Sequence, residues 1–468
     1  MAVGWKVVYG GGTPPPGEVV RPDERLSWPR TAGIGAQHVV AMFGATFVFP
    51  IVMGLDPNTA IMMSGIATIM FLLITQNRVP SYLGTSASFV GGVAAIRAAG
   101  GDSSLVTGSI LIAGLVLAAC GVIISRLGMV VIHKIFPAPV TGGVVMLIGF
   151  GLAFVVADVY WPQDQWVALL TMIAVFIGTV LLPGFWGRIA ILLGLVFGFV
   201  LSWLLDKISG DITSFNPAAN KVDTHPRVSF GGVSSASWIG LPHFHGPSFS
   251  VSATLLVLPA VIALIAENTG HVKAVAEMTG HDLDPVIGRA IMADGIGTAV
   301  ATSVGGSPTT TYAENIGVMA ATRIYSTAAY YVAGAVAILF GLCPKFGALV
   351  SATPGGVLGG VTVVLYGMIG LLGAKIWIEN RVDFANPINL VPIGAGIILA
   401  IGPVNQQITK NFSLGGIALG TIVLLAGWHL LRVLAPAHMR EALSRHLPEA
   451  GAGIAVVETG VDRFDDDT

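Results

Sequence analysis

Two glutamates, Glu267 and Glu314, are the residues best placed to do chemistry, because each lies in an otherwise apolar stretch. Glu267 follows the apolar run 258–266, and His271 lies four residues later, on the same face of a helix, where its imidazole can pair with the carboxylate. Apolar surroundings and a neighbouring imidazolium shift the pKa of a carboxyl group in opposite directions. Such a group can therefore take up and release a proton. The spacing therefore predicts a site that binds a polar molecule and exchanges protons.

Three more polar residues lie in apolar stretches: Gln37 and His38 near the N-terminus, and Asp294. The simplest alternative is that such side chains only form hydrogen bonds between helices. This alternative applies most strongly to Asp294. We expect Gln37 and His38 to belong to the same polar set as the two glutamates.

The composition places these residues in a membrane protein. The chain has 468 residues, of which 54% are apolar and 10% are charged, whereas about 25% are charged in a soluble protein. So few charges cannot cover the surface of a soluble fold of this length. The 61 glycines fit closely packed transmembrane helices. The formal net charge of −2 excludes a basic nucleic-acid-binding protein.

Fourteen apolar segments of about membrane-spanning length can be placed after residue 30. They lie near 31–55, 58–77, 80–97, 104–124, 136–157, 165–183, 187–206, 250–272, 287–304, 308–322, 324–343, 355–374, 388–403 and 413–433. Residues 1–30 are rich in proline and lack the apolar core of a signal peptide. We expect them to form a disordered cytoplasmic tail.

The distribution of basic residues predicts that both termini are cytoplasmic. With the N-terminus inside, nine basic residues lie in inner loops and span ends: Arg78, Arg126, Lys134, Arg188, Lys273, Arg289, Arg323, Lys375 and Arg381. Three lie in short outer loops or span ends: Arg97, Lys345 and Lys410. Three more, Lys207, Lys221 and Arg227, belong to the long outer loop 207–248, where the positive-inside rule has less force.

The third and tenth segments are interrupted by residues that do not favour a helix. The third opens with residues 80–88, PSYLGTSAS, and the tenth with 305–314, GGSPTTTYAE. Because the two interruptions are seven spans apart, an odd number, the halves of the chain would be inverted copies. Interrupted segments at matching places in inverted halves mark the midplane site of a transporter. We therefore predict short extended stretches at mid-membrane, although a packing seam rich in small residues is an alternative.

Other chemistry finds little support in the sequence. His271, Glu277 and His281 lack the spacing of a zinc site. No Walker A motif is present, and we find no set of nucleophile, base and orienting residue. We therefore expect neither an enzyme nor a cofactor.

Three motifs resemble the nucleobase/ascorbate transporter family. They are Gln37-His38 in the first segment, residues 266–271 (AENTGH) in the eighth, and residues 306–323 (GSPTTTYAENIGVMAATR) in the tenth, and the last most resembles the bacterial uracil permease branch. The likeness covers about residues 27 to 433. It implies an all-α membrane protein with fourteen transmembrane segments in a seven-plus-seven inverted repeat.

The resemblance also implies a division into two structural domains. A core, or transport, domain would comprise residues 31–128 and 249–345, and a gate domain residues 129–206 and 346–433. Residues 207–248 would form an extracellular loop and residues 434–468 a second cytoplasmic tail. In this family the gate domain commonly dimerises, so we expect a homodimer formed through that domain, embedded in the bacterial plasma membrane.

Positions matching the family motifs provide the expected substrate-binding residues: Glu267, Glu314, Ala313, Ala87, Tyr312, Phe89 and Tyr366. We expect proton coupling to involve His271, Glu267, His38, Gln37, Asn315 and Asp294. One position departs from the family pattern, because Ala87 stands where the uracil permeases have phenylalanine. Phe89 lies two residues further on.

The expected function is proton-coupled import of uracil by alternating access, with a proton rather than sodium as the coupling ion. Uracil has two N–H donors and two carbonyl acceptors, which suit carboxylates beside free backbone donors at helix N-termini. A xanthine, other purine or broad nucleobase permease is an alternative, because Ala87 is small. An anion carrier or channel on the same architecture is another, although two carboxylates disfavour an anionic substrate.

Overall fold

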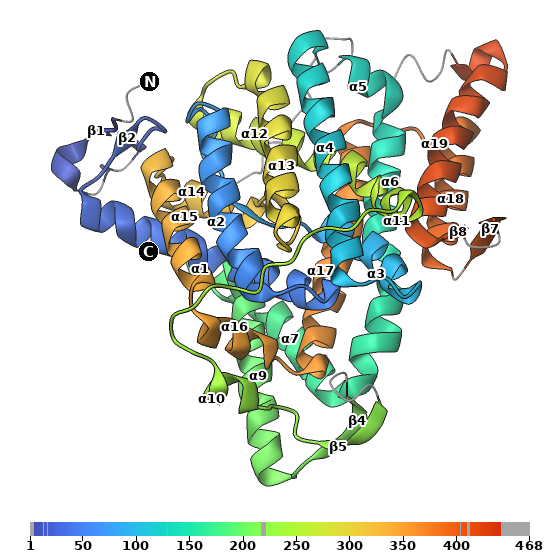
Figure 1. The fold of residues 1–468 in the computed structure, drawn as a ribbon. Coiled ribbons are helices and arrows are strands. Elements are labelled where there is room, and N and C mark those ends of the chain that lie inside the picture. Colours follow the sequence, from blue (N-terminus) through green and yellow to red (C-terminus); the bar gives the residue numbers. More distant parts are fainter. Residues whose placement is uncertain are drawn as a thin grey trace, which may run out of the picture.

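The protein is described here from a computed structural model, which defines residues 4–12, 14–15, 17–128, 130–216, 221–402, 404–409 and 412–440. Most of this chain is helical (Figure 1). The longer helices are α1 (Trp28–Met53), α2 (Pro57–Ile74), α4 (Ser103–Leu127), α6 (Ala138–Phe150), α7 (Gln165–Leu181), α9 (Ala190–Ile208), α12 (Pro259–Thr279), α13 (Asp284–Ser303), α15 (Thr327–Gly341), α17 (Gly355–Glu379), α18 (Pro387–Ile401) and α19 (Gly416–Leu434).

Shorter helices and strands complete the fold. The short helices are α3 (Val90–Ala98), α5 (Val130–Ile135), α8 (Phe185–Arg188), α10 (Gly231–Ser235), α11 (Val251–Val257), α14 (Ala313–Thr322) and α16 (Pro344–Ser351). The strands form pairs: β1 (Lys6–Val7) with β2 (Glu24–Arg25), β3 (Leu83–Thr85) with β6 (Thr309–Thr311), β4 (Ile212–Asn216) with β5 (Lys221–His225), and β7 (Asn405–Thr409) with β8 (Phe412–Gly415). A π-helical turn, Val155–Tyr160, follows α6.

Local sequence explains where several helices begin. The carboxylate of Asp56 accepts a hydrogen bond from the Thr59 N–H at the start of α2. Asp102 does the same at α4 and Asp164 at α7. A side-chain acceptor at this position satisfies one of the backbone donors that a helix leaves free at its N-terminus.

The helices have the length and polarity expected of a membrane protein. Among the described residues, eight helical segments are long and apolar enough to cross a membrane, or nine if α15 and α16, which meet at a bend of 81°, form one span. Each of the fourteen predicted segments contains at least one helix, but several are too short or too polar to count by this criterion. Helix length and composition therefore do not establish the number fourteen.

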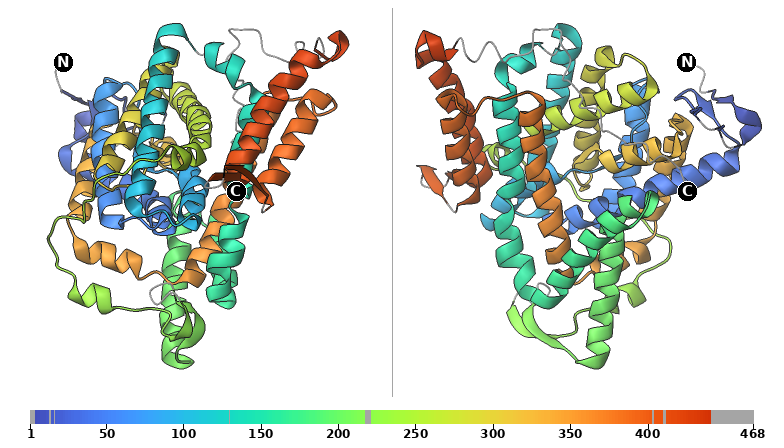
Figure 2. Two further views of the ribbon diagram at one scale, coloured as in Figure 1. Left: turned by 45° about the vertical axis from the view of Figure 1, so that its right-hand side comes forward. Right: turned by 180° about the vertical axis from the view of Figure 1, so that it is seen from behind.

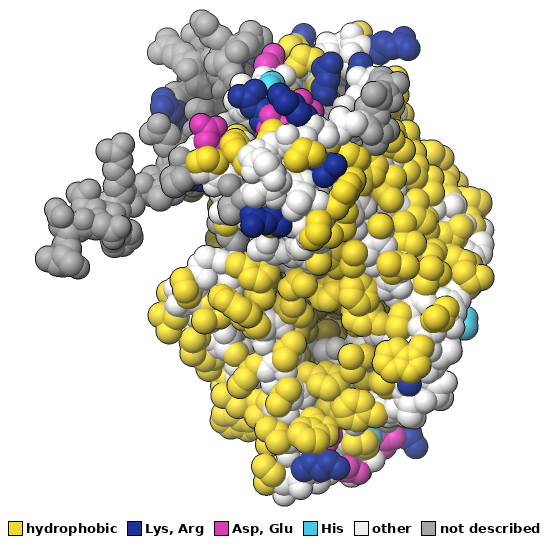
Figure 3. All heavy atoms as spheres, turned by 90° about the vertical axis from the view of Figure 1, so that its left-hand side faces the viewer, with side chains coloured by type: hydrophobic (Ala, Val, Ile, Leu, Met, Phe, Trp, Pro, Cys, Tyr) yellow, Lys and Arg dark blue, Asp and Glu magenta, His cyan; other side chains and the backbone are white. Residues whose placement is uncertain are grey.

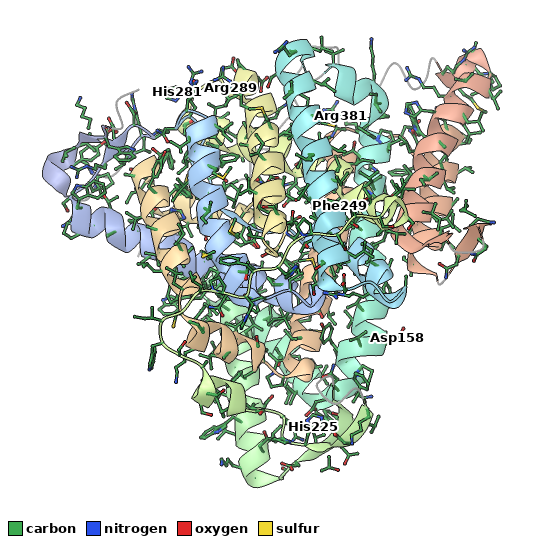
Figure 4. All side chains as sticks on the ribbon, in the orientation of Figure 1. Asp158, His225, Phe249, His281, Arg289 and Arg381 are labelled. Carbon is green, nitrogen blue, oxygen red and sulfur yellow. The ribbon has the colours of Figure 1, made fainter. Side chains whose placement is uncertain are left out.

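Figure 3 shows a broad hydrophobic band on one face of the molecule, with charged side chains gathered at its two ends. In Figure 4, His281, Arg289 and Arg381 lie toward one end, and Asp158 and His225 lie toward the other. An apolar band between polar ends is the surface that a bilayer requires.

The long helices pack in two groups. In the first group α4 packs along α13, and α2 packs along α15 and α13. In the second, α6 packs along α17, α7 along α9, and α18 along α19. Figure 2 shows α18 and α19 side by side at the edge of the second group.

The N-terminal segment is folded, so the prediction of a disordered tail is wrong for its described residues. Val20 and Leu26 are buried against Ile324, in the turn between α14 and α15. The Val20 N–H donates to the Arg323 carbonyl at 2.9 Å, and the Tyr325 N–H donates to the Val20 carbonyl at 2.8 Å. Prolines and charges did not prevent order here, because the segment binds a distant turn through its backbone.

Thr327 is expected to stabilise this arrangement measurably. Its hydroxyl donates to the Pro22 carbonyl at 2.7 Å and accepts from the Trp5 indole N–H at 2.8 Å. The Thr327→Val substitution leaves the indole donor without its acceptor, so we expect a loss of about 1–3 kcal/mol in the free energy of unfolding. The unfolding transition of the purified protein in detergent measures it. The matched control is Thr353→Val, because that hydroxyl donates only to the nearby Val350 carbonyl; equal losses in both variants would contradict the role of Thr327.

The predicted extracellular loop contains the β4–β5 hairpin and is held by an ionic cluster. The Arg227 guanidinium contacts Asp164 at 2.8 Å and Asp206 at 3.1 Å, at the ends of α7 and α9. Further along, the Ser248 N–H donates to the Ser104 carbonyl at 2.9 Å, at the start of α4. The loop therefore contacts both helix groups.

Candidate substrate and proton site

The two interrupted segments meet as a pair of short antiparallel strands. Gly84 of β3 is paired with Thr310 of β6, and the Ser86 N–H donates to the Pro308 carbonyl at 2.9 Å. The prediction of extended stretches in both segments is confirmed. After each strand the chain turns into a short helix, α3 or α14, and the first backbone N–H groups of such a helix are free for a ligand.

The Tyr312 side chain holds the β3–β6 strand pair together. Its side chain is 5% exposed, and its hydroxyl donates to the Thr85 carbonyl at 2.7 Å and accepts from the Thr46 hydroxyl at 3.2 Å. A Cβ atom added to Gly84 would lie 2.5 Å from the Tyr312 ring, so only glycine permits this approach. The sequence predicted a substrate contact for Tyr312, but its hydroxyl is occupied by bonds within the protein.

The two glutamates predicted to bind substrate lie close enough to interact. Both side chains are partly exposed, and the Glu267 carboxyl group interacts electrostatically with Glu314 and with Asp294. Asp294 of α13 is fully buried. Among the described residues no group of His, Cys, Asp and Glu side chains is arranged to hold a metal ion.

His271 contacts Thr311 rather than Glu267. Its Nδ1 lies 2.7 Å from the Thr311 hydroxyl, and no hydrogen bond joins it to Glu267 in the described part of the chain. The predicted pairing with Glu267 is therefore wrong. The spacing of four residues does place both side chains on one helical face, but β6 offers a hydroxyl acceptor at closer range.

His38 and Asn315 form a second polar contact, between α1 and α14. The Asn315 side-chain amide donates to the His38 carbonyl at 2.9 Å and approaches its Nδ1 at 3.2 Å, and the His38 ring packs against Tyr330 at 4.3 Å between centroids. His38 and Asn315 are both fully buried, whereas Gln37 is partly exposed. His38 of the first segment thus contacts the start of α14.

The remaining predicted substrate-binding residues differ in how exposed their side chains are. Ala313, the first residue of α14, is exposed and Ala87 is partly exposed. Phe89 is 1% exposed and belongs to the hydrophobic core, so its substrate contact stays a prediction. Tyr366 of α17 is 3% exposed, and its hydroxyl has no hydrogen-bond partner among the described residues.

Sequence reasoning missed three residues that connect the site: Asn268, Thr309 and Thr311. Asn268 bonds both Asp294 and Thr311, and the Thr309 hydroxyl donates to Asp294 Oδ1 at 3.5 Å. One signal could have found them. Asn268 directly follows Glu267, and the two threonines lie within the interruption of the tenth segment.

Comparison with known proteins identifies the family. A family model described as "Permease family" matches residues 30–409. The chain belongs to this permease family. This permease is therefore an integral membrane transport protein rather than an enzyme.

Individual relatives of this chain are also named as permeases. This permease is 43% identical over 410 residues to RutG of Escherichia coli (strain K12), whose name describes a pyrimidine permease; the match covers 86% of this chain and 90% of RutG. It is 35% identical to a uracil permease of Bacillus caldolyticus, covering 83% of this chain and 89% of that protein. It is 33% identical to the uracil permease of Escherichia coli (strain K12), covering 86% and 91%.

Two solved structures have the same fold as this permease. The transmembrane domain of the cyanobacterial bicarbonate transporter BicA matches with a TM-score of 0.56 at 14% identity, covering 88% of this chain and 100% of that domain. Murine Slc26a9, an anion transporter in the inward-facing state, matches with a TM-score of 0.60 at 11% identity, covering 87% and 68%. Identities this low establish the shared fold only.

Proposed function

We propose that this permease imports uracil together with a proton across the bacterial plasma membrane. The observation that carries the proposal is the placement of two partly exposed carboxyl groups, Glu267 and Glu314, beside the start of α14. Carboxylates accept hydrogen bonds from the two uracil N–H groups, and the free N–H of Ala313 can donate to a uracil carbonyl. Relatives named uracil permease support this choice of base.

The protonation of the carboxyl groups provides the coupling to a proton gradient. We propose Glu267, His271 and Asp294 as the residues that exchange the proton, with His38, Gln37 and Asn315 completing the polar set. A proton fits this site better than sodium, because sodium favours several oxygen ligands around one point.

The helix contacts support a seven-plus-seven inverted repeat with fourteen spans. In such a repeat the second span, α2, corresponds to the ninth, α13, and the fourth, α4, corresponds to the eleventh, α15. The close packing of α4 on α13 is then the same contact as that of α15 on α2, and both are present. The β3–β6 pair would lie on the axis that relates the halves, at mid-membrane.

The two groups of helices correspond to a core and a gate. The core would hold residues 31–128 and 249–345 and the gate residues 129–206 and 346–433. We propose that the core, which contains both interrupted spans, moves against the gate to alternate access. Cytoplasmic termini and a homodimer formed through the gate complete the proposal.

Uptake into proteoliposomes tests this function. Labelled uracil is expected to accumulate only when a proton gradient is imposed, and a sodium gradient alone is expected to have no effect. Unlabelled uracil should compete with the label. Uptake that does not respond to the proton gradient, or that no nucleobase inhibits, would refute the proposal.

A broader nucleobase permease is the second candidate, favoured by the small, partly exposed side chain of Ala87. A competition panel of uracil, thymine, xanthine and uric acid separates the two functions. Inhibition by uracil alone supports the first, and equal inhibition by xanthine or uric acid supports the second. Currents across a planar bilayer in the absence of any nucleobase would instead indicate an anion carrier or channel.

A further inference from the structure

A continuous chain of hydrogen bonds joins His271 to Asp294. His271 Nδ1 lies 2.7 Å from the Thr311 hydroxyl, which donates to Asn268 Oδ1 at 3.2 Å. The Asn268 amide nitrogen in turn donates to Asp294 Oδ2 at 2.7 Å. Thr311 is 1% exposed and Asn268 and Asp294 are fully buried, while His271 is partly exposed. The chain therefore connects a residue with access to solvent to a buried carboxyl group.

The direction of every bond in this chain is fixed by one backbone contact. The Asn268 amide nitrogen also donates to the Leu264 carbonyl at 3.0 Å, and a backbone carbonyl can only accept. Asn268 Oδ1 must then be the acceptor in the next bond, so the single Thr311 hydroxyl proton points to Asn268. The Thr311 oxygen can only accept from His271, which must carry a proton on Nδ1.

We infer that Asn268 and Thr311 are positioning residues that hold His271 as its Nδ1–H tautomer and anchor its ring to Asp294. The hydrogen bond at one imidazole nitrogen determines the state of the other. Nε2 is then the basic nitrogen. In the proposed proton-coupled transport, Nε2 is the atom that receives the coupling proton. This role of Nε2 rests on the proposed function.

His38 provides an internal comparison, because its contacts require the opposite tautomer. The Asn315 amide nitrogen donates to the His38 carbonyl at 2.9 Å, so it is also the donor to His38 Nδ1 at 3.2 Å. A nitrogen that accepts carries no proton, so neutral His38 has its proton on Nε2. The two histidines of the site are therefore expected to differ in a way that a spectrum can detect.

Nuclear magnetic resonance on the purified full-length protein with ¹⁵N-labelled histidine tests the assignment without substrate. His271→Asn and His38→Asn identify the two sets of signals by their disappearance. We expect His271 to carry its proton on Nδ1 and His38 on Nε2, and we expect Thr311→Val to abolish the preference at His271. A wild-type His271 protonated on Nε2, or a spectrum that Thr311→Val leaves unchanged, would overturn the inference.

Transport by three variants tests the consequence. Thr311→Val is expected to lower the maximal rate of uracil uptake at least about ten-fold. The figure is taken by analogy from metal-binding histidines, where removing the hydrogen-bond partner that orients the ring costs at least about that much. The affinity for uracil should change little, and Thr311→Ser, which keeps the hydroxyl, should restore the rate. Thr269→Val is the matched control, because its hydroxyl donates only to the Ile265 carbonyl of its own helix.

The two experiments separate this inference from the proposed function. If the wild-type protein does not take up uracil but His271 is the Nδ1–H tautomer, the inference stands and the proposed function fails. If uracil uptake is normal and Thr311→Val transports like the wild type, the proposed function stands and the inference fails.

Discussion

Replacing Glu267 by glutamine is expected to weaken uracil binding by about 10- to 150-fold, which corresponds to the 1.5–3 kcal/mol that a hydrogen bond to a charged group contributes. The glutamine keeps the size of the side chain but removes its charge and cannot release a proton. Uptake driven by a proton gradient should therefore fall to background. Titration calorimetry and proteoliposome uptake measure the two effects.

The matched control for this variant lies on the same helix. Glu277→Gln makes the identical change at an exposed position nearly three turns further along α12, outside the site. It should bind and transport like the wild type. A Glu267→Gln protein with normal affinity and normal uptake would remove Glu267 from the site, and a matching defect in Glu277→Gln would point to a general effect on α12.

The Gly84→Ala substitution, which adds a single methyl group, is expected to stop transport. The new Cβ atom of Gly84→Ala would lie 2.5 Å from both the Thr46 hydroxyl oxygen and the Tyr312 ring. Relief requires Tyr312 to move, which breaks its bond to the Thr85 carbonyl and separates β3 from β6. Overpacking of this kind costs about 1–3 kcal/mol of folding free energy. Uptake assays and the unfolding transition in detergent measure the outcome.

Gly394→Ala provides the control for the added methyl group. A Cβ atom at Gly394 in α18 would meet nothing within 4 Å, so this variant should unfold and transport like the wild type. Full activity in Gly84→Ala would mean that the strand pair tolerates movement and that Tyr312 does not hold the site together.

The position of the site could be predicted from the sequence, because the signals that mark it are local. Glycine, proline and threonine at 305–311 disfavour a helix wherever they occur, and a glutamate in an apolar run is conspicuous by itself. These features located Glu267, Glu314 and both extended stretches without knowledge of which segments pair.

The partners of individual side chains could not be predicted, because they depend on packing between distant segments. His271 could reach Glu267 on its own helix, but β6 brings Thr311 within 2.7 Å, forty residues away in the chain. Phe89 lies two residues after Ala87 in the sequence, yet the turn that precedes α3 directs its ring into the core. Asp294 was ambiguous because its donor, Asn268, is supplied by another helix.

The folded N-terminal segment has a consequence for the order in which the chain is completed. Trp5 binds Thr327, 322 residues later, so its partner does not exist when the N-terminus leaves the ribosome. At roughly 5–20 residues per second, translation supplies Thr327 about 16–64 s after Trp5. The first segment of the protein to be synthesised must therefore wait, unattached, while most of the membrane domain is made. It can reach this position only after α14 and the start of α15 have been made.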